Sequence, residues 1–313
     1  MRMRTAPGAA MMSGYLHPYY AFSLAEFGAP VELPRSRGWI LKRRIPGCHF
    51  YDAMGCYPLF SCQDWQQLYY DLEELRGELI SIALVTDPFG NYDEAQLKDC
   101  FQDVVIPFKK HYIVDLSQSL DSFISSHHRR NAGKALRYLG IEKCDDPMRF
   151  LDDWADLYSF LIARHRIRGI PAFSKSSFAR QIKVPGLLMF RAVYEGATVG
   201  MSLWYRQKAI GYYHLGACNA LGYQLRASYA LFRSVIEYSA QAQLKWLDLG
   251  GGAGIADADG DGLSRFKRGW STGIRTAYFC GRVLDRQKYR EIVTARGAIA
   301  ADYFPAYRRG EFG

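Results

Sequence analysis

Several features that would assign a function at once are missing from this sequence. No apolar run approaches the roughly 20 residues that a membrane-spanning helix needs, and the best candidate is the stretch 79–85. The seven cysteines contain no C-x-x-C pair, so neither a disulfide framework nor a zinc ribbon is indicated. The G-x-S-x-G elbow of serine hydrolases is also absent. We therefore expect a reduced, cytoplasmic protein with no metal site and no transmembrane segment.

Two further motifs are present only in part. Residues 257–262 read like the start of a calcium loop, but Arg268 occupies the twelfth position, where a bidentate Glu is required. Residues 250–254 are rich in glycine, yet they lack the Lys-Ser/Thr of a P-loop and the spacing of a dinucleotide fingerprint. We interpret these glycines as a tight turn beside an acceptor cleft.

The composition is that of a basic globular protein. The chain has 313 residues, of which 49% are hydrophobic and 23% charged, and this length suits two ordinary domains or one large one. The net charge is +9, which favours anionic partners. The excess is concentrated at 42–44, 127–137, 164–168 and 308–309. Coenzyme A, transfer RNA, a nucleotide-linked sugar or a lipid pyrophosphate would each fit, and a solvated basic face is the alternative.

Local patterns predict alternating helices and strands in both portions of the chain. In the first portion we expect strands at 38–41, 48–53, 79–85 and 111–114, and helices from 61 and over 93–101. A basic amphipathic helix at 120–139 precedes the second portion, which starts with a helix at 150–161. Next we expect strands at 187–194, 198–205 and 209–215, a helix at 226–241, a strand at 245–249, a helix at 263–270 and a strand pair or hairpin around 274–283.

Three segments of the second portion carry a family resemblance. They are Tyr212-Tyr213-His214-Leu215-Gly216-Ala217, Trp246-Leu247-Asp248-Leu249-Gly250-Gly251 and Ser264-Arg265-Phe266-Lys267-Arg268-Gly269-Trp270. In this order they resemble the acyl-CoA N-acyltransferase (GNAT) superfamily, in particular the branch of Fem-type peptidyltransferases and related predicted acetyltransferases. The resemblance implies an α/β (α+β) fold of tandem GNAT-like domains, each a mixed, largely antiparallel sheet flanked by helices. The expected domains are 1–145, which is degenerate and includes the basic linker helix, and 146–313.

The resemblance also implies a site for the donor of the acyl group. In GNAT proteins the junction between a strand and the next helix holds the pyrophosphate of coenzyme A, because a helix start offers free N–H groups and a positive dipole end. Gln224, Arg226 and Ser228 are the candidate donor-binding residues. The GNAT phosphate loop is richer in glycine, and here only Gly222 is present. The donor is thus left open between acyl-CoA and aminoacyl-tRNA, with no cofactor bound permanently.

The remaining candidates concern the acceptor and the chemistry. The resemblance places Lys267 near the substrate or its phosphates, and we assign Lys267 and Arg130 to the acceptor; a solvated helix face is the alternative. N-acyl transfer is helped by a base that takes the proton of the amine, and both His214 and Asp248 are candidates. A core histidine and an aspartate that orients the following turn are the structural alternatives. Tyr213 is a candidate for protonating the leaving thiolate, or it packs.

Taken with the charge, these residues predict an N-acyltransferase. It would move an acyl or aminoacyl group to the amino group of a small or carrier-linked acceptor, such as an amino sugar, a peptide precursor or an amine. Peripheral contact with an anionic lipid-linked precursor is compatible with the basic surface. The competing prediction is a catalytically inactive GNAT-fold protein that binds nucleic acid or acts as a scaffold.

Overall fold

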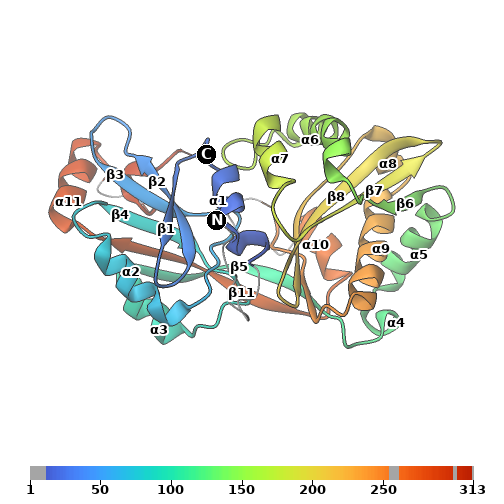
Figure 1. Ribbon diagram of the computed structural model, residues 1–313, viewed down its shortest axis with the longest axis horizontal. Helices are drawn as coiled ribbons and strands as arrows, with labels where there is room; N and C mark the ends of the chain where they lie inside the picture. Colours follow the sequence, from blue (N-terminus) through green and yellow to red (C-terminus); the bar gives the residue numbers. More distant parts are fainter. Residues whose placement is uncertain (1–11, 254–260, 299–301, 312–313) are drawn as a thin grey trace, which may run out of the picture.

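The computed structural model describes residues 12–253, 261–298 and 302–311. Their strands form one sheet of 11 strands in the order β1-β2-β3-β4-β11-β5-β10-β9-β8-β7-β6 (Figure 1). Within these residues only β3–β4 and β9–β10 pair in parallel. The sheet is open and mostly antiparallel, and helices flank it, which confirms the predicted fold class.

The sequence order of the elements alternates strands and helices throughout. The strands are β1 (Ala29–Leu33), β2 (Gly38–Arg44), β3 (Tyr51–Gly55), β4 (Ser81–Val85), β5 (Val104–Asp115), β6 (Gly140–Lys143), β7 (Leu187–Tyr194), β8 (Ala197–Gln207), β9 (Ile210–Cys218), β10 (Trp246–Asp248) and β11 (Gly273–Val283). The α-helices are α1 (Pro18–Ser23), α2 (Leu68–Glu74), α3 (Glu94–Cys100), α4 (Leu120–Phe123), α5 (Ser126–Ala135), α6 (Leu151–His165), α7 (Lys175–Gln181), α8 (Ala220–Gln224), α9 (Ala227–Gln241), α10 (Gly262–Arg268) and α11 (Arg286–Ala295). Short 3₁₀ turns lie at η1 (Gly14–Leu16), η2 (Trp65–Gln67), η3 (Pro147–Phe150) and η4 (Ala306–Arg308).

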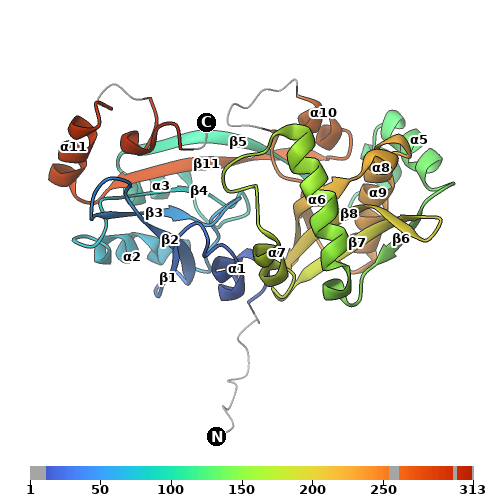
Figure 2. The same cartoon turned by 90° about the horizontal axis from the view of Figure 1, so that it is seen from above.

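Two sets of five neighbouring strands repeat one pairing pattern. The sets β1-β2-β3-β4-β11 and β7-β8-β9-β10-β5 each contain two antiparallel pairs, one parallel pair and a final antiparallel pair. The final strand of each set comes from the opposite part of the sequence, and β5 and β11 run side by side across the molecule (Figure 2). The division into 1–145 and 146–313 stays a prediction. Strand β5, from the first part, pairs with β10 of the second, and β11, from the second part, pairs with β4 of the first.

Hydrophobic packing holds the helices on both faces of the sheet. The predicted stripe of α6 buries Trp154, Leu157 and Tyr158 in a core shared with α1 and α7. Helix α9 buries its predicted stripe in a second core with α5, which covers the other face of β5 and β7–β10. Helices α2 and α3 enclose a third core against β1–β4 and β11. The helical spacing of apolar residues therefore predicted correctly which faces of these helices are buried.

Three local predictions need correction. The expected strand pair at 274–283 is the single strand β11, because residues 273–281 pair with β5 and residues 279–283 pair with β4. Between the expected strand at 209–215 and the expected helix at 226–241, where no helix was predicted, lies the short helix α8, which Asn219 caps by accepting from Gly222 N–H at 2.9 Å. The basic helix is interrupted before Ser125 and forms α4 and α5. Within the described ranges, no helix is both long and apolar enough to cross a bilayer.

Candidate active site

A fork between β9 and β10 lies in the second set of strands. These parallel strands pair only where residues 210–212 face 246–248. Beyond Tyr212, β9 continues beside β8, whereas the chain after β10 stays with β5, where Leu249 N–H donates to Tyr112 O at 2.8 Å. The strands therefore separate, and in the described part of the chain the edge of β9 beyond this point has no strand partner on the β10 side.

The corresponding position between β3 and β4 is closed. These strands pair at 53–54 and 82–83, and the chain then returns so that Phe60 forms a parallel bridge with Thr86. Phe60 N–H also donates to Val85 O at 2.6 Å. The backbone at Phe60 thus fills the position that stays open beside β9. This filled position is the physical difference that makes the first set of strands the degenerate one.

Lys267, in the last turn of α10, lies at the open fork. Its Nζ donates to Gly251 O at 2.6 Å and lies 5.4 Å from the centre of the Tyr213 ring. Only 4% of the residue is exposed. Burial lowers the pKa of its ammonium to about 8, although the charges of Asp248 and Asp261 oppose this decrease. A buried ammonium that titrates near neutral pH is suited to stabilising charge or donating a proton.

Tyr213 shares this place with Lys267. Its ring packs against Phe232 of α9 and against Trp204, so it faces the α9 side of the sheet. A Cβ on Gly216 would lie 2.4 Å from the Tyr213 hydroxyl, and glycine is therefore required there. Burial raises the pKa of Tyr213, which keeps its hydroxyl protonated. Lys267 accordingly sits on the α9 side of the sheet, and its contact with the acceptor stays a prediction.

Asp248 faces the opposite side of the sheet. The preceding Leu247 belongs to the core beneath α9, and successive side chains of a strand alternate between faces. The two carboxylate oxygens lie 3.0 and 2.8 Å from His111 Nδ1, and one accepts from Gly250 N–H at 2.7 Å. The side chains of Asp248 and His111 are almost fully buried. Sequence reasoning missed His111 because it joins Asp248 through the pairing of β5 with β10, 137 residues apart.

His214 is enclosed within the α6-side core. Its Nδ1 lies 3.1 Å from Tyr15 Oη, and its Nε2 lies 3.0 Å from Gln181 Oε1. Burial lowers the pKa of His214 to about 3. Both ring nitrogens are occupied by protein groups, so these surroundings favour the packing interpretation. A catalytic role for His214 stays a prediction.

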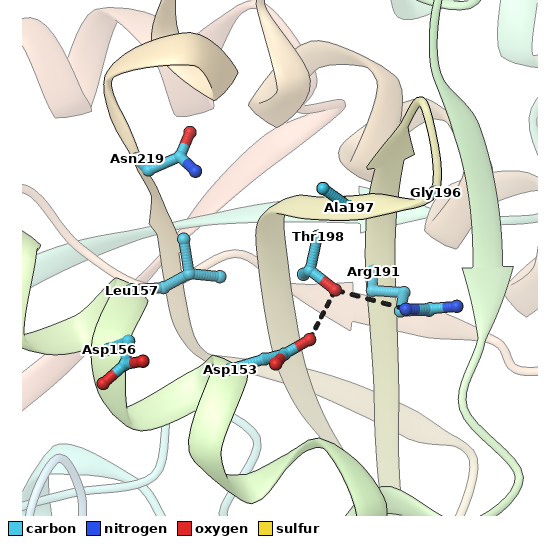
Figure 3. Close-up of a pocket in the computed structure, with 8 residues that line it drawn as sticks. All are labelled: Asp153, Asp156, Leu157, Arg191, Gly196, Ala197, Thr198 and Asn219. Carbon is cyan, nitrogen blue, oxygen red and sulfur yellow. Dashed lines mark hydrogen bonds between the residues drawn. The ribbon is translucent and has the colours of Figure 1, made fainter.

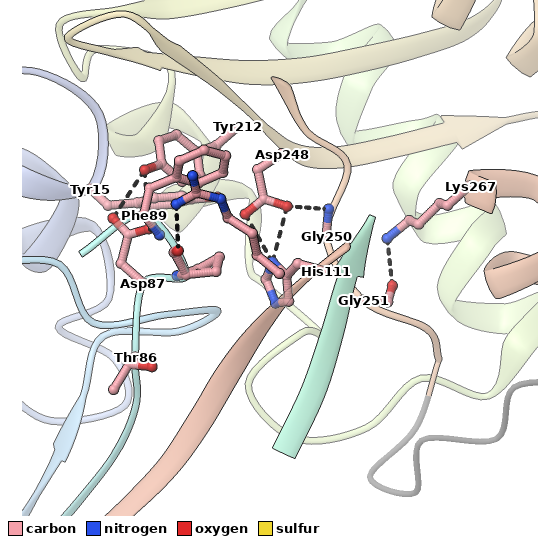
Figure 4. A network of polar contacts seen from close by, with 12 residues as sticks. Tyr15, Thr86, Asp87, Phe89, His111, Tyr212, Asp248, Gly250, Gly251 and Lys267 are labelled. Atoms are coloured by element: carbon pink, nitrogen blue, oxygen red, sulfur yellow. Dashed lines mark hydrogen bonds and ion pairs between the residues drawn. The ribbon is translucent and has the colours of Figure 1, made fainter. Parts of the chain in front are cut away.

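A buried carboxylate connects the two sets of strands near these residues. Asp87, which follows β4, accepts from Tyr212 Oη at 3.1 and 3.0 Å and from Ser61 Oγ at 2.9 Å. Burial raises the pKa of Asp87 to about 6. Figure 4 shows this network beside the Asp248–His111 pair, with Lys267 apart from both and donating to Gly251 in the chain after β10. The fork is thus flanked by polar groups from β4, β5, β9 and α10.

The predicted donor-binding residues cluster at the start of α9. Arg226 precedes the helix in the left-handed conformation, with φ of 60°, and its side chain is exposed, as is that of Gln224. Ser228 is half-buried, and its Oγ lies 3.5 Å from Cys218 Sγ. The start of a helix also offers N–H groups without a partner in the preceding turn. The three residues stay candidates for the donor phosphates.

Arg130 lies on α5, which packs beside α9. His127 on the same helix brings its Nε2 to 3.4 Å from Tyr229 Oη in the first turn of α9. Arg130 follows His127 by three residues, on the same helical side, and is exposed. This placement favours a role beside the donor loop, and the predicted contact of Arg130 with the acceptor stays untested.

An open depression elsewhere contains none of the predicted site residues. It lies where α6 meets the turn between β7 and β8 (Figure 3). Its lining consists of Asp153, Asp156, Leu157, Arg191, Gly196, Ala197, Thr198 and Asn219. Thr198 Oγ1 donates to Asp153 at 2.6 Å and accepts from Arg191 at 3.2 Å. Because these polar groups bond to one another, the depression is not part of the candidate site.

Metal-ligating side chains do not gather in the described residues. No group of three or more His, Cys, Asp or Glu side chains there could hold an ion. Residues 257–260 of the calcium-like segment lie outside the described residues, whereas Asp261 caps α10 by accepting from Leu263 and Ser264 N–H.

Known structures share this architecture at low sequence identity. Neither a family model nor a curated protein matches the chain. The chain is similar to FemX, with a TM-score of 0.63 and 14% identity over 91% of this chain and 94% of that one. It is also similar to the C-terminal domain of a putative lysylphosphatidylglycerol synthetase from Agrobacterium fabrum, with a TM-score of 0.62 and 14% identity over 87% and 90%. An L-PGS from Bacillus licheniformis gives a TM-score of 0.59 and 13% identity over 91% and 98%.

These likenesses extend over nearly the whole length of each chain. They show a common fold, and at such low identity they show the fold alone. Together with the repeated strand pattern, they confirm that the chain has the Fem-like fold that its three motifs predicted.

Proposed function

We propose that this chain is an acyltransferase that moves an acyl or aminoacyl group to an amino group at the β9–β10 fork. The observation that carries the proposal is the buried ammonium of Lys267 at the open fork, whereas the equivalent fork at β3–β4 is filled by its own backbone. A preorganised charge in a water-poor place stabilises negative charge that develops during acyl transfer. The transferase activity implied by FemX and the synthetases is consistent with this placement.

The donor is expected to enter from the α9 side. The extended part of the donor molecule that carries the acyl group can hydrogen-bond along the free edge of β9 beyond Tyr212, as an added strand would. Its phosphates would then reach the start of α9, where Arg226 and Gln224 are exposed. Arg130 on the neighbouring α5 adds a second positive charge. Both acyl-CoA and aminoacyl-tRNA carry phosphates in such a position, so the proposal includes both.

The chemistry at the fork follows from this orientation. Lys267 would stabilise the oxyanion or protonate the leaving atom, and Tyr213 supports its ammonium through the ring face. The acceptor amine would approach from the other face, where Asp248 lies. The proposed acceptors are an amino sugar, a peptide precursor, including a lipid-linked one, or a simple amine.

A donor screen tests the proposal. Melting temperatures would be measured with acetyl-CoA, longer acyl-CoAs and alanyl-tRNA, with free coenzyme A and uncharged tRNA as matched controls. A substrate that binds the folded state should raise the melting temperature as its concentration rises. Labelled acyl groups from that donor should then appear on one acceptor of an amine panel.

The inactive nucleic-acid-binding alternative gives a different result in the same screen. Such a protein would be stabilised by RNA according to its length and the salt concentration, with no preference for the charged end and no transfer. That outcome would refute the transferase proposal.

A further inference from the structure

The Asp248–His111 pair has the arrangement of a general base with its orienting carboxylate. Gly250 N–H holds one oxygen of Asp248 at 2.7 Å, and both oxygens lie within hydrogen-bond distance of His111 Nδ1. An ionised carboxylate only accepts hydrogen bonds, so in the neutral imidazole this contact selects the tautomer with the hydrogen on Nδ1 and the lone pair on Nε2. No hydrogen bond occupies Nε2 within the described residues, and Nε2 is not among their fully buried unpaired atoms.

The position of the pair relative to Lys267 matters for its role. Asp248 is the last paired residue of β10, so it marks the point where the fork opens. Asp248 binds Gly250 N–H from one side, and Lys267 binds the next residue, Gly251, through its carbonyl. The two side chains therefore bind neighbouring residues of the same turn, and one peptide group lies between the two that they contact. The carboxylate belongs to the face opposite α9, and the ammonium lies against Tyr213 on the α9 face.

We propose that His111 is the catalytic base that takes the proton of the acceptor amine and that Asp248 positions it. This inference rests on the proposed transferase function. The acceptor ammonium first gives one proton to His111 Nε2. The neutral amine nitrogen then forms a bond with the donor carbonyl carbon, the C–S or C–O bond to the carrier breaks, and the nitrogen releases its second proton to water. The leaving sulfur or oxygen takes a proton from Lys267. Exchange with water returns His111 and Lys267 to their starting states.

Charged and titratable groups from the neighbouring elements surround this pair. Arg275 on β11 pairs opposite His111, and Lys109 and Lys110 precede His111 on β5. The charge of Asp248 acts on Tyr15 of η1, Asp87 after β4, Tyr212 of β9 and Lys267 of α10. Asp248 is the one that contacts the imidazole directly. It is therefore the group placed to compensate the positive charge when the proton arrives.

The test compares two acceptor amines at pH 7 in the His111→Gln variant. Ethylamine is largely protonated at this pH and needs a base, whereas hydroxylamine is largely neutral and does not. With the donor that wild type uses, acetyl-CoA or alanyl-tRNA, turnover with ethylamine should fall roughly 100-fold or more. Turnover with hydroxylamine should fall less than about tenfold. His49→Gln, an exposed histidine between β2 and β3, is the matched control and should keep both rates.

A second variant protects the test against misfolding. Nitrogen-15 NMR of the histidines should show the Nδ1–H form of His111 in wild type, and Asp248→Asn should lose that single form together with turnover on ethylamine. Equal losses with both amines, unchanged rates in folded His111→Gln, or an Nε2–H form in wild type would each overturn the base role. Wild type that transfers to no member of the amine panel, these two amines included, would overturn the proposed function and, with it, this role.

Discussion

The burial of the Lys267 ammonium at the fork lowers the stability of the folded protein. The pKa of its ammonium is about 8 in the folded protein, below its usual 10.5, so the folded state disfavours the charge. This cost is fully present below pH 8 and fades as the pH rises towards 10.5. Lys267→Met keeps much of the apolar stem and should raise the free energy of unfolding at pH 7 by about 1 to 3 kcal/mol. Urea unfolding at pH 7 and 9.5 checks this, with a smaller gain expected at pH 9.5.

The same variant should lose transfer activity. Removing a preorganised positive charge from the reacting group typically lowers turnover by about 100-fold or more. Single-turnover rates separate this effect from donor binding. The exposed Lys245→Met is the matched control and should change neither stability nor rate. If the Lys267→Met protein were as active as wild type, Lys267 would be a buried structural cation.

The burial of His214 should affect how the free energy of unfolding changes at acid pH. The pKa of His214 is about 3 in the folded protein, below the value of about 6.5 for a free histidine. Its contribution to stability is therefore complete above pH 6.5 and is lost as the pH falls towards 3. Between pH 7 and 4.5, His214→Gln should lose about 2 kcal/mol less stability than wild type. Urea unfolding at both pH values measures the difference.

Turnover of the His214 variant separates packing from catalysis. The hydrogen bonds to Tyr15 and Gln181 favour packing, so folded His214→Gln should retain turnover at low temperature. A folded variant without turnover would contradict this interpretation and return His214 to the list of candidate bases.

At the scale of single residues, the sequence predicted which residues lie at the fork better than it predicted which side chains contact them. Asp248 and Lys267 were found because each lies in a short motif, and both lie beside the fork. Their contacts could not be predicted, since His111 reaches Asp248 only through the pairing of β5 with β10. The enclosure of His214 depends on Tyr15, 199 residues away. Local patterns carry no information on such distant neighbours.

The start of α9 is the element on which donor binding should depend. Arg226 is exposed at the free N–H groups of this helix. Arg226→Ala should weaken donor binding by about 1 to 3 kcal/mol, because one charge-assisted phosphate contact is lost. Isothermal titration with the donor measures this change, and Arg226→Lys should retain part of the affinity.

A matched control lies two turns further along the same helix. Arg233 forms a surface pair with Glu237 at 2.5 Å, and such pairs contribute little. Arg233→Ala should therefore leave donor affinity unchanged. Equal affinity of wild type and a folded Arg226→Ala protein would remove Arg226 from the site.

Elements with a clear period were predicted well. The strand expected at 187–194 matches β7, and Glu195-Gly196 forms the turn of its hairpin with β8, because a nearly continuous apolar run and a Glu-Gly turn are local signals. Strands β1 and β6 were missed because both lie at the edges of the sheet and bury few side chains. The single strand β11 was misread because its length depends on its two neighbours.

For the whole molecule, the exchange of β5 and β11 predicts how fragments behave. Fragment 1–145 would contain β4 and β5 without the strand that lies between them. Neither 1–145 nor 146–313 should unfold cooperatively alone, whereas the two fragments expressed together should recover the fold. Thermal unfolding followed by circular dichroism and amide NMR dispersion distinguishes these states. A cooperative transition in isolated 1–145 would show that β11 is dispensable there.

The tandem character of the fold was accessible from the sequence, but the strand exchange was not. The order of elements in the second portion is the GNAT order, and the first portion repeats it in part. Which strand enters which half depends on sheet pairing between residues that lie far apart, such as Gly281 with Ala83. Loop lengths and periodicity do not determine that choice.

The position of β11 also has a consequence for synthesis of the chain. Strand β5 ends at residue 115, and β11 begins at residue 273. At about 5 to 20 residues per second, the ribosome needs roughly 8 to 30 seconds to make the segment between them. During that interval β4 and β5 expose backbone edges that another nascent chain can pair with. The newborn protein is thus open to intermolecular strand pairing until its last strand emerges, and chaperones that shield such edges would be needed late in translation.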